Sequence, residues 1–125
     1  VTGVQTCALP IFIAFQYGHQ KGDEVLIQLS RTLEQHCRRG DYVFRWGGEE
    51  FLILLPHTTE ETAIGVAEQL REAVAGINIP QLPGCTVSIG VARHLAGESL
   101  DDLFKRVDDA LYRAKNSGRN KVLAA

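Results

Sequence analysis

The strongest constraint on the fold is a hairpin predicted near the middle of the chain. Residues 42–46 and 51–55 are two runs rich in β-forming side chains, and Gly47 and Gly48 lie between them. A short connection containing glycine between two such runs is typical of a tight hairpin turn. Pro56 ends the second run, because proline cannot donate a backbone hydrogen bond to a neighbouring strand. We therefore expect two adjacent antiparallel strands here.

Three segments around this hairpin have the apolar spacing of helices with one buried face. They span residues 23–37, 58–75 and 99–114. The second and third begin with residues that resemble helix caps, Thr58 with Glu61 and Ser99 with Asp102. The residues expected to end the helices are Gly40, Gly76 and Gly118. The side chains expected to face the core are Val25, Leu26, Leu29, Leu33, Ile64, Ala67, Leu70, Leu100, Leu103, Phe104, Val107, Leu111 and Ala114.

Two further strands complete the predicted sheet. Residues 86–92 form a short run of β-formers, and residues 121–123 are expected to form a final edge strand. Helices and strands thus alternate with short connections. This order predicts an α/β protein, an α+β sandwich in which a mainly antiparallel sheet is flanked by helices.

Composition and charge indicate one globular domain without a nucleic-acid or membrane surface. A chain of 125 residues buries roughly two-thirds of its unfolded surface. With 13 basic and 15 acidic residues its net charge is −2, so no basic patch for nucleic acid is expected. No apolar run reaches the roughly 20 residues that a membrane span needs. Three widely spaced cysteines, Cys7, Cys37 and Cys85, form no metal-type pair, which favours a reducing cytoplasmic compartment.

The first eleven residues, VTGVQTCALPI, do not share the pattern of the rest. They have no helical or strand period, and Pro10 would interrupt a strand that ran into Phe12. The string resembles the conceptual translation of a common sequencing-adapter oligonucleotide, read from a GTG codon. The alternative is a natural amino terminus with little pattern. We expect residues 1–11 to be a non-native, adapter-derived segment and residues 12–125 to form the domain.

The turn of the hairpin carries the clearest chemical signal. The run Gly47-Gly48-Glu49-Glu50-Phe51 places two carboxylates directly after two glycines. Glycines let the backbone approach a bulky ligand closely, and magnesium ions bind one or two carboxylates together with phosphate oxygens and water. Side chains alternate along a strand, so Glu49 and Glu50 should point to opposite sides, and only one would serve a given metal ion. On this pentapeptide alone, an ordinary hairpin with solvated acids is the alternative.

Five segments, in the same order, resemble the GGDEF domain of the diguanylate cyclases. GGEEF itself resembles the signature that gives the family its name. The other four are YGHQKGD at residues 17–23, RRGD at 38–41, TVSIGVA at 86–92 and DDALYRAKNSGRN at 108–120. The resemblance runs from about Phe12 to Leu123 and so covers nearly the whole domain.

The resemblance implies a fold and a reaction. The fold is ferredoxin-like and similar to the palm of polymerases and adenylyl cyclases. Two such domains meet face to face, each holding one GTP, and each 3′-hydroxyl attacks the α-phosphate of the other nucleotide. The products are cyclic di-GMP and two pyrophosphates. The implied cofactor is magnesium or manganese, and the implied partners are GTP, a second copy of the domain, and cyclic di-GMP as product and feedback ligand.

Carried over by position, the resemblance assigns roles around the nucleotide. Glu49 would be the metal ligand, and Glu50 would lie beside the reacting hydroxyl. Gly47 and Gly48 would leave room for the nucleotide. Asp23 would accept hydrogen bonds from the guanine edge, with an N-cap of the first helix as its alternative or additional role.

Two basic sites complete the assignment. Lys115 and Arg119 would hold the phosphates, although cations are also favourable at a helix carboxyl terminus without any ligand. Arg38 and Asp41 would form an inhibitory site for the product, with the arginine pairing bidentately to guanine or phosphate. The alternative for these two residues is an exposed ion pair worth roughly 0–1 kcal/mol.

The sequence also departs from the family pattern. The first strand of the family carries an Asp-x-Asp run and an asparagine, whereas residues 10–16, PIFIAFQ, contain neither an acid nor an asparagine. We therefore expect the first strand to be incomplete, the helix before it to be absent, and the metal site to lack one carboxylate. Gln69 stands where the family often has a second inhibitory arginine, which weakens the expected product site.

These observations lead to a layered hypothesis. The parent gene is expected to encode a cytoplasmic diguanylate cyclase domain, the output end of a longer signalling protein. The sequence leaves open the sensory part and any membrane anchor. The 125-residue chain itself is expected to have little or no activity. The alternative is a degenerate GGDEF module that acts as a receptor for cyclic di-GMP or GTP. An unrelated ferredoxin-like interaction domain would not explain the order of the motifs.

Overall fold

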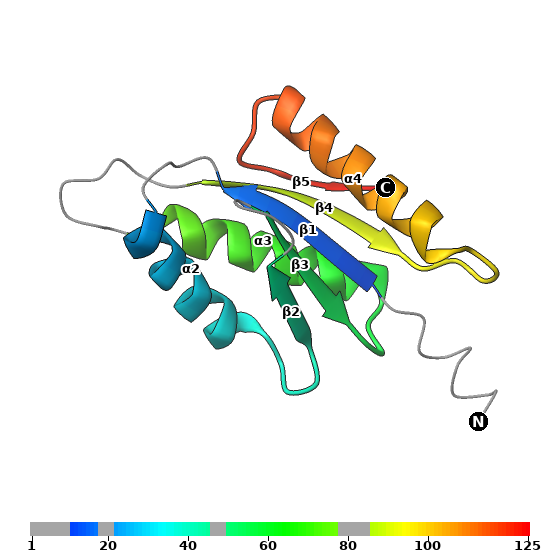
Figure 1. The fold of residues 1–125 in the computed structure, drawn as a ribbon, viewed down its shortest axis with the longest axis horizontal. Coiled ribbons are helices and arrows are strands. Elements are labelled where there is room, and N and C mark those ends of the chain that lie inside the picture. The colour runs from blue at the N-terminus through cyan, green and yellow to red at the C-terminus, as the bar shows by residue number, and fades with distance from the viewer. Residues whose placement is uncertain (1–10, 18–21, 46–49, 78–85) are drawn as a thin grey trace.

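The computed structural model describes the backbone of residues 11–17, 22–45, 50–77 and 86–125, and their side chains from residue 27 onward. The elements in these ranges are β1 (Ile11–Tyr17), α2 (Gly22–His36), β2 (Tyr42–Arg45), β3 (Glu50–Leu55), α3 (Glu60–Ala75), β4 (Val87–Arg93), α4 (Leu100–Asn116) and β5 (Val122–Ala124) (Figure 1). The strands form one sheet in the order β2-β3-β1-β4-β5. All neighbours are antiparallel except β4 and β5, so the predicted mainly antiparallel sheet is confirmed.

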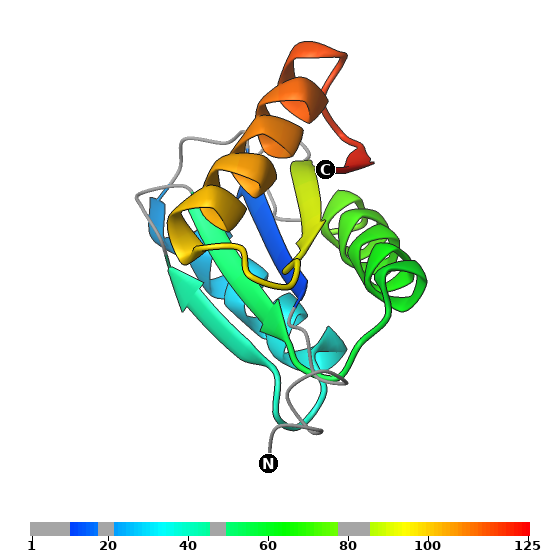
Figure 2. The ribbon, with the colours of Figure 1, turned by 90° about the vertical axis from the view of Figure 1, so that its right-hand side faces the viewer.

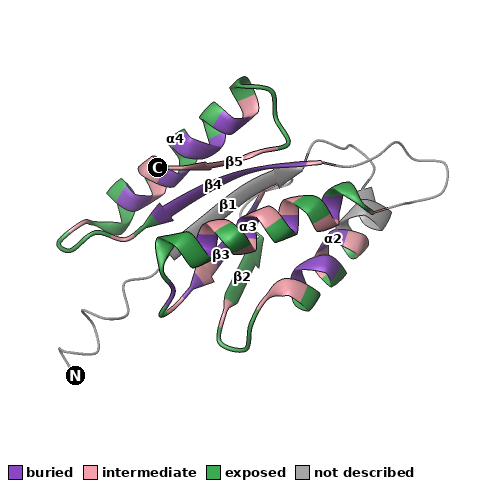
Figure 3. Cartoon of the chain, turned by 180° about the vertical axis from the view of Figure 1, so that it is seen from behind, coloured by how far each residue is buried: buried purple, intermediate pink, exposed green. Residues whose placement is uncertain are grey.

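Alternating side chains give this sheet two buried faces. Odd-numbered residues of β3 and β4 pack against α2 and α3, whereas Leu52 and Ala92 pack against α4. Figure 2 shows α3 and α4 on opposite sides of the strands, and in Figure 3 the buried residues of these helices face the sheet. The side chains of the larger core are Leu29, Leu33, Phe51, Ile53, Leu55, Ala63, Ala67, Leu70, Val74, Val87, Ile89 and Val91. This three-layer arrangement is the α+β sandwich that the order of elements predicted.

The sequence predicted the helices and the later strands to within two residues, but two details of the helices differ. The N-cap of α3 is Thr59, whose hydroxyl accepts a hydrogen bond from the backbone of Thr62, and not Thr58. Leu100 is the first residue of α4 and is 56% exposed, so the buried stripe of that helix begins at Leu103. The predicted cap of α4 is confirmed, since Ser99 accepts from the backbone of Asp102 at 3.1 Å.

The first strand, expected to be incomplete, has seven residues and lies at the centre of the sheet. β1 pairs with β3 along one edge and with β4 along the other. It begins at Ile11, directly after Pro10, and so includes one residue of the segment expected to be non-native. Backbone hydrogen bonds on both sides hold any sequence of β-formers in such a position, because the ladder uses main-chain groups only.

Gly90 brings α4 into direct contact with the sheet. It lies in the middle of β4 on the face that α4 covers, and an added Cβ would be 2.6 Å from both the backbone nitrogen of Leu111 and the carbonyl oxygen of Val107. Protein Cβ atoms do not approach backbone atoms so closely. The helix can therefore lie on β4 only because residue 90 has no side chain.

Gly90→Ala is expected to lower the free energy of unfolding by about 1–3 kcal/mol, because the methyl group meets backbone that cannot move aside. Gly65→Ala in α3 is the matched control, since a Cβ there has open space around it. That change should raise the free energy of unfolding by about 0.5–1 kcal/mol. Urea denaturation compares the two variants, and similar small effects at both positions would contradict the close approach of α4.

An arginine and a glutamate close the connection between β4 and α4. Arg106 Nε and Nη2 donate to the two carboxylate oxygens of Glu98 at 2.6 and 2.9 Å, and Nη2 also reaches the carbonyl oxygen of Arg93. The backbone N–H of Leu95 donates to the same carboxylate at 3.1 Å. These bonds, led by the one from Arg106, lower the pKa of Glu98 to about 2.

The stability of the domain should therefore depend on the charge of Glu98. Its folded pKa lies below the ordinary value of 4.5, so its contribution is complete above that value and is lost as the pH falls from about 5 towards 2. In Glu98→Gln, the loss of urea stability between pH 6 and pH 3 should be smaller than in the unmodified chain. Parallel curves for the two proteins would show that the Glu98 carboxylate makes no such contribution.

Candidate functional site

One end of the sheet brings together the segments that carry most of the predicted site residues. β1 ends there and β3 and β4 begin there, because β1 is antiparallel to both: Gln16 lies opposite Glu50, and Tyr17 opposite Val87. β5 is parallel to β4 and starts beside it, so α4, which precedes β5, ends there too. The first turn of α2 follows closely on the end of β1. We call this region the turn end of the sheet (upper left in Figure 1).

Glu50 is the described acidic residue of the GGEEF run at the turn end. It is the first residue of β3, is half-buried, and alternates in phase with Leu52, which packs towards α4. Gly47, Gly48 and Glu49 lie outside the described residues. The expected opposite orientation of Glu49 and Glu50 therefore stays a prediction.

Asp23 lies within the first turn of α2. The helix begins at Gly22, so the interpretation of Asp23 as the N-cap is wrong, and the residue is already helical. A carboxylate in the first turn is favourable because it faces the positive end of the helix dipole. The side chain of Asp23 lies outside the described residues, and its contact with guanine stays a prediction.

The end of α4 places Lys115 and Arg119 on either side of the helix terminus. The predicted helix ends at residue 114, but α4 continues to Asn116, so Lys115 lies inside its last turn and is half-buried. Arg119 follows the end of the helix and is exposed. Burial and the neighbouring Asp109 raise the pKa of Asp108, and the charge of Lys115 opposes this rise.

Gly118 ends α4 as predicted, through a recognisable capping motif. Its φ is +120°, and the backbone N–H of Arg119 donates to the carbonyl oxygen of Ala114 at 3.0 Å. This long backward bond across a left-handed glycine is the Schellman motif, which satisfies helix carbonyls that otherwise lack partners.

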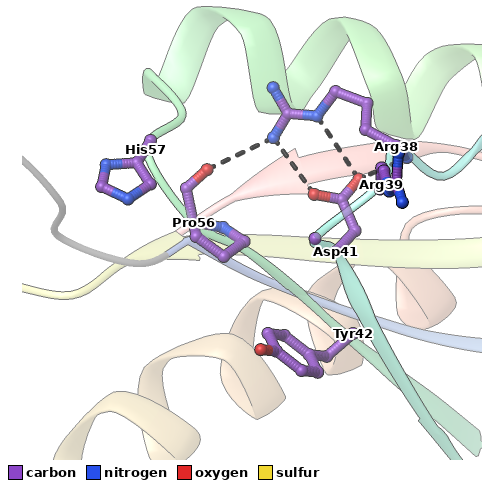
Figure 4. Close-up of a pocket in the computed structure, with 7 residues that line it drawn as sticks. Arg38, Arg39, Asp41, Tyr42, Pro56 and His57 are labelled. Carbon is purple, nitrogen blue, oxygen red and sulfur yellow. Dashed lines mark hydrogen bonds and ion pairs between the residues drawn. The ribbon is translucent and has the colours of Figure 1, made fainter.

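Arg38 and Asp41 form a pocket at the opposite end of β3 (Figure 4). Arg38 Nη2 donates to Asp41 Oδ1 at 3.2 Å, and the backbone N–H of Arg38 donates to Asp41 Oδ2 at 2.7 Å. The Asp41 side chain is only 3% exposed, whereas that of Arg38 is 47% exposed. This burial distinguishes the pair from a solvated surface ion pair. The hollow is lined by Arg38, Arg39, Gly40, Asp41, Tyr42, Pro56 and His57.

Two further groups, which no motif in the sequence indicated, also hold Arg38. Its Nη2 donates to the carbonyl oxygen of Pro56 at 3.3 Å and to the hydroxyl of Thr58, which is buried and itself donates to Pro56 at 2.9 Å. The spacing of Thr58 to Glu61 predicts a helix cap, but its hydroxyl is engaged by Arg38 and Pro56 instead. Gln69, the position of the expected second arginine, is exposed on α3 and does not line this pocket.

The two predicted sites are therefore separated by the length of β3. Six residues span this strand, so Glu50 and the Arg38 pocket lie roughly 17 Å apart along it. The two sites can be tested by separate substitutions.

The described strand residues at the turn end include one carboxylate, that of Glu50. β1, which lies next to β3, has the sequence IFIAFQY and supplies no carboxylate, and Gln16 stands opposite Glu50. Among the residues that the structure describes, no group of three histidine, cysteine or acidic side chains is placed to hold a metal ion.

Within the same ranges, no helix is long and apolar enough to cross a membrane.

Comparison with known protein families and proteins gives consistent matches. The family model described as "Diguanylate cyclase, GGDEF domain" matches residues 12–121. The chain is similar to the diguanylate cyclase DgcM of Escherichia coli K12, with 66% identity over 109 residues. This match covers 87% of the chain and 27% of DgcM, so the chain spans about a quarter of the length of this curated relative.

Solved structures resemble the fold over nearly its whole length. The GGDEF domain of DgcB from Caulobacter crescentus, solved in complex with c-di-GMP, has a TM-score of 0.89 and 26% identity, with 98% of this chain and 81% of that one covered. The active GGEEF domain of a diguanylate cyclase from Vibrio cholerae has a TM-score of 0.83 and 33% identity, with 93% and 83% covered.

Proposed function

We propose that this chain, which belongs to the GGDEF domain family of diguanylate cyclases, supplies one half of an assembly that condenses two molecules of GTP into cyclic di-GMP. The observation that carries the proposal is the meeting of Glu50, the first turn of α2 and the end of α4 at one end of the sheet. The 66% identity to a diguanylate cyclase supports it.

In the proposed reaction, two domains face each other with one GTP each. Each 3′-oxygen forms a bond to the α-phosphorus of the other nucleotide, the bond from that phosphorus to the bridging oxygen breaks, and pyrophosphate leaves while the hydroxyl proton is lost. The protein's task is to position both nucleotides and to stabilise the charge that develops on the phosphates.

The proposed roles of the side chains follow from their positions around the turn end. Asp23 accepts hydrogen bonds from guanine, and Lys115 and Arg119 hold the phosphates. Gly47 and Gly48 leave space for the nucleotide. Glu50 lies beside the reacting hydroxyl, and Glu49 is the carboxylate proposed to bind magnesium or manganese, which neutralises phosphate charge in such reactions.

We further propose that this chain, as it stands, has little activity. The neutral sequence of β1 leaves the metal ion one carboxylate short, and magnesium binding weakens accordingly. The family match begins at residue 12, which supports the proposal that residues 1–11 are adapter-derived. The domain is proposed to act in the cytoplasm as a homodimer, within a longer protein whose anchoring the chain does not define.

Incubation with GTP and magnesium tests this proposal by mass spectrometry of the product. The 125-residue chain should form cyclic di-GMP on the order of 100-fold more slowly than a version whose first residues are restored, because metal charge stabilisation is worth several kcal/mol. The restored residues are read by resequencing the locus with different adapters. If resequencing returns the same eleven codons, the adapter proposal fails, and rapid turnover by the chain would refute its proposed inactivity.

A receptor for cyclic di-GMP is the second candidate function. The observation that favours it is the ordered Arg38 pocket, which stands apart from the incomplete metal site. The guanidinium is held in place by Asp41, Pro56 and Thr58, so little side-chain entropy is lost when a ligand binds to it. Such a pocket can bind guanine or phosphate without any catalysis.

Calorimetric titration with cyclic di-GMP tests this candidate. The unmodified chain should bind, and Arg38→Ala should weaken binding at least about tenfold, since an arginine bonded to a charged or planar group is worth roughly 1.5–3 kcal/mol. Arg31→Ala, an exposed arginine on α2, is the matched control and should bind normally. A chain that does not bind cyclic di-GMP has no receptor function.

A further inference from the structure

The turn between α4 and β5 has an unusual backbone. Gly118, Arg119 and Asn120 have φ values of +120°, +62° and +48°, so three consecutive residues lie in the left-handed region. Glycine adopts this region freely and asparagine tolerates it, but it is unfavourable for a long side chain such as that of Arg119. Backbone of this kind persists only where surrounding contacts hold it.

Contacts from the turn's own segment hold part of this conformation. The backbone N–H of Arg119 bonds to Ala114, and the ammonium group of Lys121 donates to the carbonyl oxygen of Ser117. The carbonyl oxygen of Lys121 in turn accepts from the backbone of Ile89 in β4 at 2.9 Å. These bonds fix both ends of the turn and leave the side chain of Asn120 to be held by another element.

That element is α3, on the opposite face of the sheet from α4. Arg71 Nη1 donates to Asn120 Oδ1 at 3.2 Å, across 49 residues of sequence. α3 and β5 are in contact, so the bond crosses beside the edge strand from one layer to the other. It ties Asn120 to a helix that carries none of the proposed nucleotide contacts.

Glu68 holds the guanidinium of Arg71 in the orientation that this bond requires. Arg71 Nε and Nη2 donate to the two carboxylate oxygens of Glu68 at 3.1 and 3.2 Å, and the Arg71 side chain is 22% exposed. The same hydrogen bond raises the pKa of Arg71. Because the guanidinium is planar and both of these donors are engaged, Nη1 is presented towards Asn120 in a fixed position.

We propose that Arg71 is a positioning residue: held by Glu68, it fixes Asn120 and thereby the left-handed backbone of Arg119, so that the Arg119 side chain meets the phosphates of a bound GTP. This inference rests on the proposed phosphate contact of Arg119. When the backbone of Arg119 is already fixed, less conformational entropy is lost as its long side chain binds the phosphates. Arg71 therefore affects GTP affinity only through Arg119.

The test uses two single variants and their combination, two control variants and an Arg119→Gln background. Arg71→Met keeps the apolar stem and removes the donor, whereas Asn120→Gly removes the acceptor and still permits a positive φ. Asn120→Asp keeps an acceptor oxygen and should preserve the contact. Arg31→Met on α2 controls for the loss of one exposed positive charge. Amide hydrogen exchange by NMR reports on the turn, and titrations with GTP and GMP report on phosphate binding.

Arg119 amide exchange should become about tenfold faster in Arg71→Met and Asn120→Gly, with Ser117 as an unchanged reference on the helix side. The affinity for GTP should fall about three- to tenfold in both variants. The affinity for GMP should fall less, because GMP has fewer phosphates for Arg119 to contact. The double variant should bind GTP no more weakly than the more severely affected single variant, as expected for two residues that act through one contact. In an Arg119→Gln background, Arg71→Met should have no further effect on GTP affinity.

The outcomes separate this inference from the proposed function. Unchanged Arg119 exchange in both variants overturns the positioning role, whether or not GTP binds. Faster exchange with unchanged GTP affinity also overturns it, since the turn then moves without consequence for the phosphates. If the unmodified chain does not bind GTP, the proposed nucleotide site fails in this chain and the phosphate step of the inference fails with it. Faster exchange then supports only the contact between Arg71 and Asn120.

Discussion

The position of α4 depends on the absence of a side chain at Gly90. Because β4 presents bare backbone there, the backbone of α4 at Val107 and Leu111 lies directly against the strand. The rest of α4 follows as a rigid rod, which carries its last turn and the 118–120 turn to the end of the sheet where β3 begins. A helix held further from the sheet would place Lys115 and Arg119 elsewhere. The hydrogen bond from Arg71 to Asn120, which joins residues 49 positions apart, depends on the same placement.

The fold separates two kinds of site by one short strand. Glu50 begins β3 at the turn end, and Pro56, directly after β3, accepts a hydrogen bond from Arg38 at the other end. The first site is assembled from segments far apart in sequence, whereas the second is built from a single loop and the residues that follow β3. This difference explains why the pocket can keep its internal contacts in a chain whose turn end is proposed to be short of one metal-binding carboxylate.

The structure also separates the requirements of the fold from those of the chemistry. β1 is held by main-chain hydrogen bonds to β3 and β4, and these accept the neutral sequence IFIAFQY as readily as an acidic one. The sheet therefore forms without the carboxylates on which the family's reaction is expected to depend. Similarity of fold, with a TM-score of 0.89 to the GGDEF domain of DgcB, consequently speaks for the architecture and not for turnover by this chain.

Much of this protein was determined by the sequence alone, because the deciding interactions are local. Apolar periodicity located the three described helices, Gly118 ended α4, and Ser99 capped it, each through contacts within a few residues. The order of five motifs identified the family, although the roles of Asp23, Glu49, Lys115 and Arg119 remain predictions. Only the tertiary structure decided which threonine caps α3, because Thr58 is recruited by Arg38, 20 residues away. It also decided that α4 lies against Gly90 and that Arg71 bonds to Asn120, since contacts between layers leave no period or spacing in the sequence.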